Sequence, residues 1–242
     1  MIVRRHHNLQ LQVLAAFLFA CLAPLALPAQ QPDAAAVIRG VDAAVKARVA
    51  RIASYTVTEH YAVYRNNDEI HPAAEMTVKT TYRKESGKSY AILSQSGSSI
   101  LRNFVLSPLL DHEKQINQPG TREAAFFISD NYEMQLKPGG IQQIDGRECL
   151  ALSINPKHKA PNLIQGTLWV DARDYSIVQL EGTASKSPSL LTGPAQVMRQ
   201  YTRVRGFAQA THARAVSISP LFGQTVVTID YRDYAIQLQP GR

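Results

Sequence analysis

Most of this sequence alternates between apolar and polar residues with a period of two, and this alternation constrains the fold more than any other feature. The clearest segment runs from Met76 to Tyr82, where Val78 and Thr80 share the parity of the two ends. A period of two places successive side chains on opposite faces of a strand, so the segment predicts a strand with one apolar face. Glu85-Ser86-Gly87-Lys88 follows as a turn signal and predicts an antiparallel hairpin.

The second half of the chain continues the strand pattern, with turn residues between the segments. The predicted strands are 131–136, 142–155, 165–171, 176–184, 195–205, 207–219 and 223–238. Pro138-Gly139-Gly140 and Asp145-Gly146 are two of the predicted turns. Strands of about ten residues that are joined by hairpin turns indicate an antiparallel meander, rolled into an open or partly closed barrel.

Two helical regions accompany the strands. The first is predicted over 33–54, with Asp33 as N-cap. Its apolar residues recur at helical spacing and form one stripe: Ile38, Val41, Val45, Val49 and Ile52. The second region begins near residue 100, and Ser107-Pro108 predicts an N-cap followed by proline at the first helical position. We therefore expect an α+β protein, mainly β, with a long N-terminal helix and short inserted helices that cover an opening in the sheet.

The N-terminus has the order of features that is typical of a secretory signal peptide. Arg4 and Arg5 precede a largely apolar run over 13–27, and the small residue Ala29 follows. We expect cleavage after residue 29, which leaves 30–242 as a single exported domain. The prediction places the mature protein in the periplasm as a monomer.

Two other interpretations of the N-terminus are open. A transmembrane anchor would need about 20 clean apolar residues, and Pro24 and Pro28 interrupt this run. A lipid anchor on Cys21 is the second alternative, because residues 18–21 resemble a degenerate lipobox. Phe19 is unusual in such a motif, and the apolar run continues past Cys21, so we favour cleavage.

Cysteine content and charge indicate which disulfides and which partners to expect. Cys149 is the one cysteine that would remain after cleavage, so the sequence predicts no intrachain disulfide, and alternation around Cys149 predicts a buried strand position. The formal net charge of the whole chain is +7, of which Arg4 and Arg5 contribute two. The remaining excess is scattered along the sequence. It suits contact with anionic lipid surfaces, and we expect no nucleic-acid partner for an exported chain.

No catalytic signature is present: the sequence lacks a nucleophile elbow, a P-loop, paired cysteines and a zinc-protease motif. Residues 111–113 read Asp-His-Glu, but three consecutive residues on a helix point in different directions and do not converge on one ion. Asp171 with Asp174 lies at a predicted turn, and Asp230 with Asp233 lies in a predicted strand; both pairs fit structural roles. We predict a non-enzymatic protein with no catalytic residues, no metal and no cofactor.

The order of elements and several stretches of sequence resemble a known family. Gly-Thr-Leu-Trp-Val-Asp at 166–171 and Tyr-Ser-Ile-Val-Gln-Leu-Glu-Gly at 175–182, followed by 201–206 and 229–234, are similar to strands of the outer-membrane lipoprotein-sorting superfamily. This superfamily includes LolA, LolB and the RseB-like sensor domains. The stretch 131–147, with Asn-Pro-Lys at 155–157, looks like a group of exported bacterial proteins of undefined function.

The resemblance implies a half-open antiparallel β-barrel with lid helices and an apolar concavity that holds acyl chains. It covers most of the mature chain, but the family's lid-locking arginine has no matching position here. The residues that we expect to bind ligand are Met76, Val78, Tyr82, Tyr90 and Ile92 on the sheet and Leu101, Phe104 and Val105 on the lid. The predicted function is non-enzymatic binding or carriage of a lipid or of lipoprotein acyl chains. The alternative is an envelope-sensing or protein-docking module without cargo, with an envelope membrane protein as partner.

Overall fold

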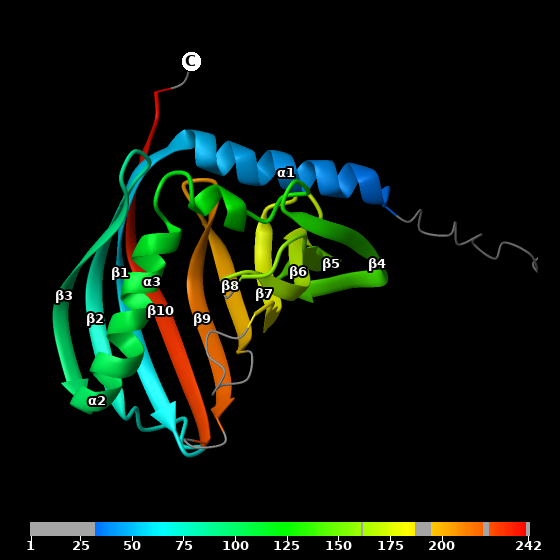
Figure 1. Ribbon diagram of the computed structural model, residues 1–242. Helices are drawn as coiled ribbons and strands as arrows, with labels where there is room; N and C mark the ends of the chain where they lie inside the picture. Colours follow the sequence, from blue (N-terminus) through cyan, green and yellow to red (C-terminus); the bar gives the residue numbers. More distant parts are fainter. Residues whose placement is uncertain (1–31, 161, 187–194, 220–222, 241–242) are drawn as a thin grey trace, which may run out of the picture. The chain divides into compact units, whose positions relative to one another are not determined.

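The computed structural model describes residues 32–160, 162–186, 195–219 and 223–240 (Figure 1). The predicted signal peptide, including Cys21, lies outside the described residues. The chain from Asp33 onward forms one compact unit. Within the described ranges, no helix combines the length and apolar character needed to cross a membrane.

The described residues form one antiparallel sheet of ten strands. In chain order the strands are β1 (Ile52–Arg65), β2 (Ala74–Arg83), β3 (Gly87–Gly97), β4 (Tyr132–Ile144), β5 (Arg147–Pro156), β6 (Ile164–Asp171), β7 (Ile177–Ala184), β8 (Gln196–Val204), β9 (Phe207–Ser219) and β10 (Gly223–Leu238). Their order across the sheet is β3-β2-β1-β10-β9-β8-β7-β6-β5-β4. Because β3 and β4 are the two edges, the sheet is open, and the predicted class of a mainly β half-open barrel with helices is confirmed.

The helices lie on one side of this curved sheet. They are α1 (Ala34–Arg51), α2 (Ser99–Leu101), the π-helical turn η1 (Arg102–Leu106), α3 (Ser107–Ile116) and the 3₁₀ turn η2 (Arg122–Ala125). Figure 1 shows α1 across one end of the strands, and α2, η1 and α3 over β1, β2 and β10. Residues 99–116 are named the lid segment below. Its Leu106 and Leu110 pack on Met76 and Val78 of β2 in a buried cluster.

The long N-terminal helix forms where the sequence predicts it. The side chain of Asp33 accepts a hydrogen bond from the backbone N–H of Ala35 at 3.0 Å, which confirms the predicted N-cap. The residues that α1 buries are Val37 and Val41, so the buried stripe is shorter than the predicted one. Ile52 is the first residue of β1, because the chain becomes extended there and leaves the helix.

A close approach of Tyr175 requires glycine at position 40 of α1. A Cβ atom built on Gly40 would overlap the Tyr175 ring, and Tyr175 itself has a positive φ of 58°. Gly40→Ala gains helix propensity of about 1 kcal/mol, but the overlap forces the ring away from its packed position. We expect a net destabilisation of about 1–3 kcal/mol, measured by urea denaturation. The control is Ala43→Gly on the exposed face of α1, which changes helix propensity alone. A Gly40→Ala protein that is more stable than the unsubstituted protein would contradict this account.

The lid segment begins earlier than predicted. Ser107 is not an N-cap, because its backbone is helical and α3 has no side-chain cap. Ser98 serves as the cap instead, and its hydroxyl accepts from the N–H of Leu101 at 3.3 Å. A π-helical turn precedes Pro108, which has no N–H to donate, so one continuous helical segment reaches Ile116.

The predicted turn at Pro138-Gly139-Gly140 is also wrong. Strand β4 continues through it, and its register with β5 is irregular between Leu136 and Ile141, where residues 137–140 lie opposite Ala151 alone. Gly139 has a φ of 64° and supplies the left-handed residue that the irregular strand requires. The turn itself lies at Asp145-Gly146, where both residues have positive φ.

Candidate ligand-binding cavity

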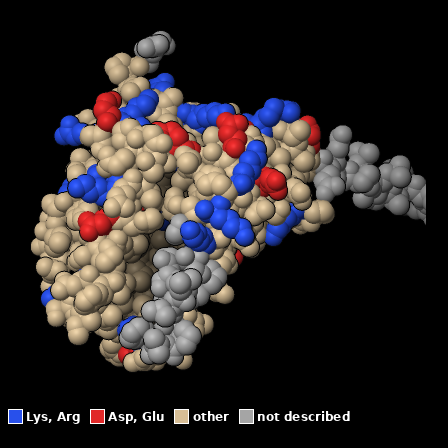
Figure 2. Space-filling view, viewed as in Figure 1, with Lys and Arg blue, Asp and Glu red and all other residues tan. Residues whose placement is uncertain are grey.

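A cavity of about 910 Å³ lies between the concave face of the sheet and the helices. Its walls come mainly from α1, from the lid segment and from strands β7 to β10, with further residues from β1, β3, β6 and η2, so residues far apart in the sequence meet around one space. Figure 2 shows the same face as Figure 1, hollowed near its centre, with Lys and Arg side chains gathered along the upper half. The open sheet therefore encloses a space of the size that small ligands occupy.

Strand β9 explains why this space is empty of side chains. The small residues that it contributes to the cavity wall are Ala208, Ala210, Ala213, Ala215 and Ser217. On the neighbouring strands the wall carries larger side chains, such as Leu180 and Ile229. An alanine ends at Cβ and cannot reach the helices opposite, so the middle of the sheet leaves a hollow between two packed clusters.

One row of inward-facing residues crosses the sheet beside this hollow. Following the strand register from β4 to β2, the row reads Leu136, Leu152, Leu168, Leu180, Arg199, Ala213, Ile229, Tyr61 and Met76. Arg199 is the only charged member of this described row. Its position on β8 places a guanidinium on an otherwise mainly apolar wall.

Polar groups from β1 and β10 face the same space. Glu59 is 3% exposed and accepts a hydrogen bond of 2.5 Å from the hydroxyl of Tyr61. Burial, followed by the charge of Glu59, raises the pKa of Tyr61 far above its usual value. Burial also raises the pKa of Tyr231, the register partner of Glu59. Both phenols therefore remain neutral; Tyr231 lines the cavity beside Glu59, and Tyr61 lies in the buried cluster next to it.

An ion pair joins the lid segment to the edge strand β3. Lys88 Nζ donates to Glu113 Oε2 at 3.0 Å, and both side chains are largely buried. Burial alone would raise the pKa of Glu113, but Lys88 and then Arg199 outweigh it and lower the pKa to about 2. The hydroxyl of Tyr90 adds a second link by donating to Asp111 at 2.7 Å.

The end of the cavity next to α1 contains further hydrogen-bond donors. Arg48 of α1 donates through Nε to the carbonyl of Ala208 at 3.0 Å and through Nη2 to Oε1 of Gln209 at 3.2 Å. Arg122 lies over the ring of Tyr82, 5.6 Å from its centroid, and pairs with Glu123 through Nε at 2.9 Å. These contacts hold α1 and η2 against the sheet.

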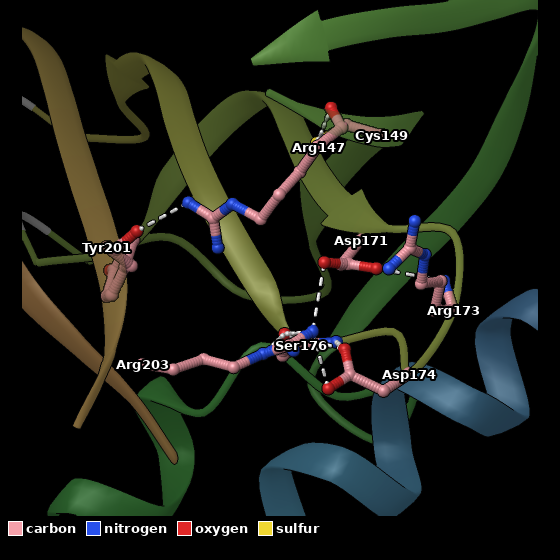
Figure 3. Close-up of polar contacts among 8 residues, drawn as sticks. All are labelled: Arg147, Cys149, Asp171, Arg173, Asp174, Ser176, Tyr201 and Arg203. Carbon is pink, nitrogen blue, oxygen red and sulfur yellow. Dashed lines mark hydrogen bonds and ion pairs between the residues drawn. The ribbon is translucent and has the colours of Figure 1, made fainter. Parts of the chain in front are cut away.

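Three of the four aspartates in the pairs noted in the sequence have basic partners. Arg203 pairs with Asp171 at 2.9 Å and with Asp174 at 2.6 Å, and Figure 3 shows these groups clustered around the turn between β6 and β7. Asp230 pairs with His212 at 2.8 Å. Asp171, Asp174 and Asp230 are thus each engaged by a basic group, which fits the predicted structural roles. Among the described residues, no three His, Cys, Asp or Glu side chains lie together as a metal site would need.

The eight residues predicted to bind ligand fall into separate places. Phe104 and Val105 line the cavity. The six that the described lining does not include are Met76, Val78, Tyr82, Tyr90, Ile92 and Leu101. Met76 and Val78 are buried beneath the lid segment, and Tyr90 and Leu101 pack on the same cluster. Tyr82 stacks on Tyr55, and Ile92 is 47% exposed on the edge strand.

The cavity-lining residues of β8 and β9 were not predicted from the sequence. A usable signal was present in the small residues Ala213, Ala215 and Ser217, which recur at every second position of one strand. Alanine is a poor strand former, so a strand face built from it indicates either close packing or a void. Arg199 gave a second signal, because it falls on the apolar face of its strand.

No protein-family model matches the sequence, and no curated protein matches it significantly. The chain is similar to the solved structure of a LolA superfamily protein from Nitrosomonas europaea, at 14% identity over 86% of this chain and 96% of that one, with a TM-score of 0.44. It is similar to an outer membrane lipoprotein-sorting protein domain from Vibrio parahaemolyticus, at 14% identity over 81% and 91% of the two chains, with a TM-score of 0.46. A third similar structure is that of a DUF1329 family protein from Desulfovibrio piger, at 16% identity over 83% of this chain and 93% of that one, with a TM-score of 0.41.

At these identities and TM-scores, function has to be argued from the cavity of this chain. The sequence itself resembles the outer-membrane lipoprotein-sorting superfamily. The open antiparallel sheet with its helices is also the architecture that this resemblance implies. Sequence pattern and architecture thus agree with a resemblance to the lipoprotein-sorting superfamily.

Proposed function

We propose that this protein is a non-enzymatic periplasmic carrier that binds a lipid, or the acyl chains of a lipoprotein, in the cavity of the sheet. The mature protein would be the single domain 30–242, released by cleavage of the signal peptide and acting as a monomer. The observation that carries the proposal is the 910 Å³ cavity, whose volume is near the upper end of the range of about 300–1,000 Å³ for ligand pockets.

The chemistry of the wall supports an acyl chain as ligand. Ile164, Ile177, Leu180 and Val197 line one side of the cavity, and Val105 of the lid segment lines another. Burial of each methylene group contributes about 0.8 kcal/mol, so a chain of a dozen carbons gains enough to offset the entropy lost on binding. The lid segment is held to edge strand β3 by an ion pair and a hydrogen bond between side chains. Separation of the lid segment from this open edge would give a ligand a route into the cavity.

The test is to purify the mature protein gently from a bacterial periplasm, measure its native mass and extract bound lipid. We expect a mass above that of the polypeptide and phospholipid or acylated peptide in the extract. A second measurement adds a fluorescent fatty acid to delipidated protein, and we expect saturable uptake. A mass equal to that of the polypeptide, together with no uptake, would contradict the carrier function.

A second candidate function rests on the exposed apolar side chains near the edge strand. Ile92 and Leu93 of β3 are 47% and 59% exposed, and Ile100 and Phe104 of the lid segment are 67% and 79% exposed. Exposed apolar groups beside an unpaired strand are typical of protein-docking surfaces. An envelope-sensing or docking module would use this surface and carry no cargo, and the absence of lipid uptake in the test above would favour it.

A further inference from the structure

The buried side-chain atoms of the described cavity wall that lack a hydrogen-bond partner are all donors. Among the described residues, the buried atoms without a hydrogen-bond partner include Arg199 Nε, Arg122 Nη1 and Gln209 Nε2, and all three residues line the cavity. Each of these atoms carries N–H and cannot accept a hydrogen bond. A buried donor without an acceptor is costly, so a ligand that brings oxygen atoms would relieve the same deficit at three places.

The orientation of Gln209 is fixed by its neighbour. Arg48 can only donate, and its Nη2 lies 3.2 Å from Oε1 of Gln209, so the amide oxygen must face Arg48 and the amide nitrogen must face away from it. Gln209 is 1% exposed, and its side chain belongs to the cavity wall. The contact with Arg48 of α1 therefore fixes which end of the Gln209 amide is the nitrogen, and the N–H without a partner does not result from exchanged oxygen and nitrogen positions.

Arg199 carries the strongest signal of the three, because it is a charge on a mainly apolar row. Glu113 already pairs with Lys88 at 3.0 Å, and Glu59 accepts from Tyr61, so the nearby carboxylates have other partners. Burial lowers the pKa of Arg199, but Tyr201, Tyr231 and Glu113 raise it by more, and the side chain stays charged. A charged group in such a wall is stabilised when an oxyanion approaches it.

We propose that the cavity selects amphiphiles with an anionic head group, a carboxylate or a phosphate, whose oxygens accept hydrogen bonds from Arg199. The acyl chain would lie on the apolar wall that includes Leu180 and Val197, next to Arg199. This inference rests on the proposed function, since it names the class of lipid that the same cavity binds. Gln209 and Arg122 would offer additional donors to the oxygen-rich end of the ligand.

The test compares ligands of equal chain length that differ in head-group charge. Delipidated mature protein is loaded with the apolar fluorophore 1-N-phenylnaphthylamine, which is then displaced at pH 7.5 by dodecanoate, dodecyl phosphate or methyl dodecanoate, each below its aggregation concentration. A charge-assisted hydrogen bond is worth about tenfold or more in affinity, so dodecanoate or dodecyl phosphate should displace the probe at about one tenth of the ester concentration. The better of the two identifies carboxylate or phosphate as the preferred oxyanion.

Two variants of Arg199 and one control variant locate the effect. Arg199→Met keeps the length of the side chain and should bring the anionic ligands to the level of the ester, whereas Arg199→Lys keeps the charge and should retain part of the preference. Arg232→Met removes an exposed cation from strand β10, which β9 separates from the strand of Arg199, and should leave the preference unchanged. Thermal unfolding of each variant confirms that it is folded.

The outcomes separate the two proposals. Equal displacement by acid, phosphate and ester in the unsubstituted protein would overturn the head-group inference and leave lipid binding intact. A preference that survives in folded Arg199→Met would overturn the role of Arg199. If neither the fluorophore nor any of the three ligands binds, the carrier function itself fails.

Discussion

Replacing Ala215 with tryptophan is expected to weaken fatty-acid binding by about 10- to 100-fold. Ala215 lies on β9 and lines the cavity at the point where the row of small residues leaves it empty. An indole ring there excludes at least two or three methylene groups of a ligand, each worth about 0.8 kcal/mol. Titration with a fluorescent fatty acid measures the loss.

The stability of the same variant should move in the opposite direction. Filling an apolar hollow buries new surface without removing a contact, so we expect an unfolding temperature equal to or above that of the unsubstituted protein. Ala91→Trp is the matched control, because Ala91 is exposed on β3 and does not belong to the described cavity wall. Unchanged affinity in a folded Ala215→Trp protein would show that lipid binds elsewhere.

The architecture was predictable because it depends on local patterns. The two-residue alternation specifies which strands exist and which face of each is apolar, and turn residues such as Asp145-Gly146 specify that consecutive strands pair antiparallel. Asp33 marks the start of α1 by a mechanism that involves only neighbouring residues. The order of the sheet then follows from hairpins, apart from the pairing of β1 with β10, which joins distant parts of the chain.

The cavity was much harder to predict, because it depends on which side chains of different strands and helices lie opposite one another. Met76 and Val78 have the same alternation whether they line a cavity or pack beneath a helix, and the lid segment covers them with Leu106 and Leu110. The alternation of β8 places Arg199 on an apolar face, but the register of β7, β8 and β9 is needed to show that it lies between Leu180 and Ala213. Local sequence therefore indicates which residues are buried, and the register decides which of them surround an empty space.

The ion pair between Lys88 and Glu113 is expected to hold the lid segment on the sheet, and its loss should be the largest stability effect in the molecule. Lys88→Met leaves the carboxylate of Glu113 without its ion-pair partner in a largely buried place, which costs about 3–5 kcal/mol. Glu113→Gln should cost a similar amount. The double variant should lose less than the sum of the two, because both single changes remove the same interaction. Urea denaturation measures all three, and Lys114→Met, an exposed position on the same helix, should stay within about 0.5 kcal/mol of the unsubstituted protein.

The pH dependence of stability gives the same ion pair an independent signature. The pKa of Glu113 falls from 4.5 to about 2 in the folded protein, so its contribution is complete above about pH 4.5 and disappears as the pH falls towards 2. A shift of this size corresponds to about 3 kcal/mol, and the unsubstituted protein should lose that much more than Glu113→Gln across this interval. Unfolding free energies measured between pH 5 and pH 2 test this expectation. If the two curves run parallel over that range, Glu113 does not hold its charge through Lys88, and the lid segment is held by the packing of Leu106 and Leu110 and by the Tyr90–Asp111 hydrogen bond.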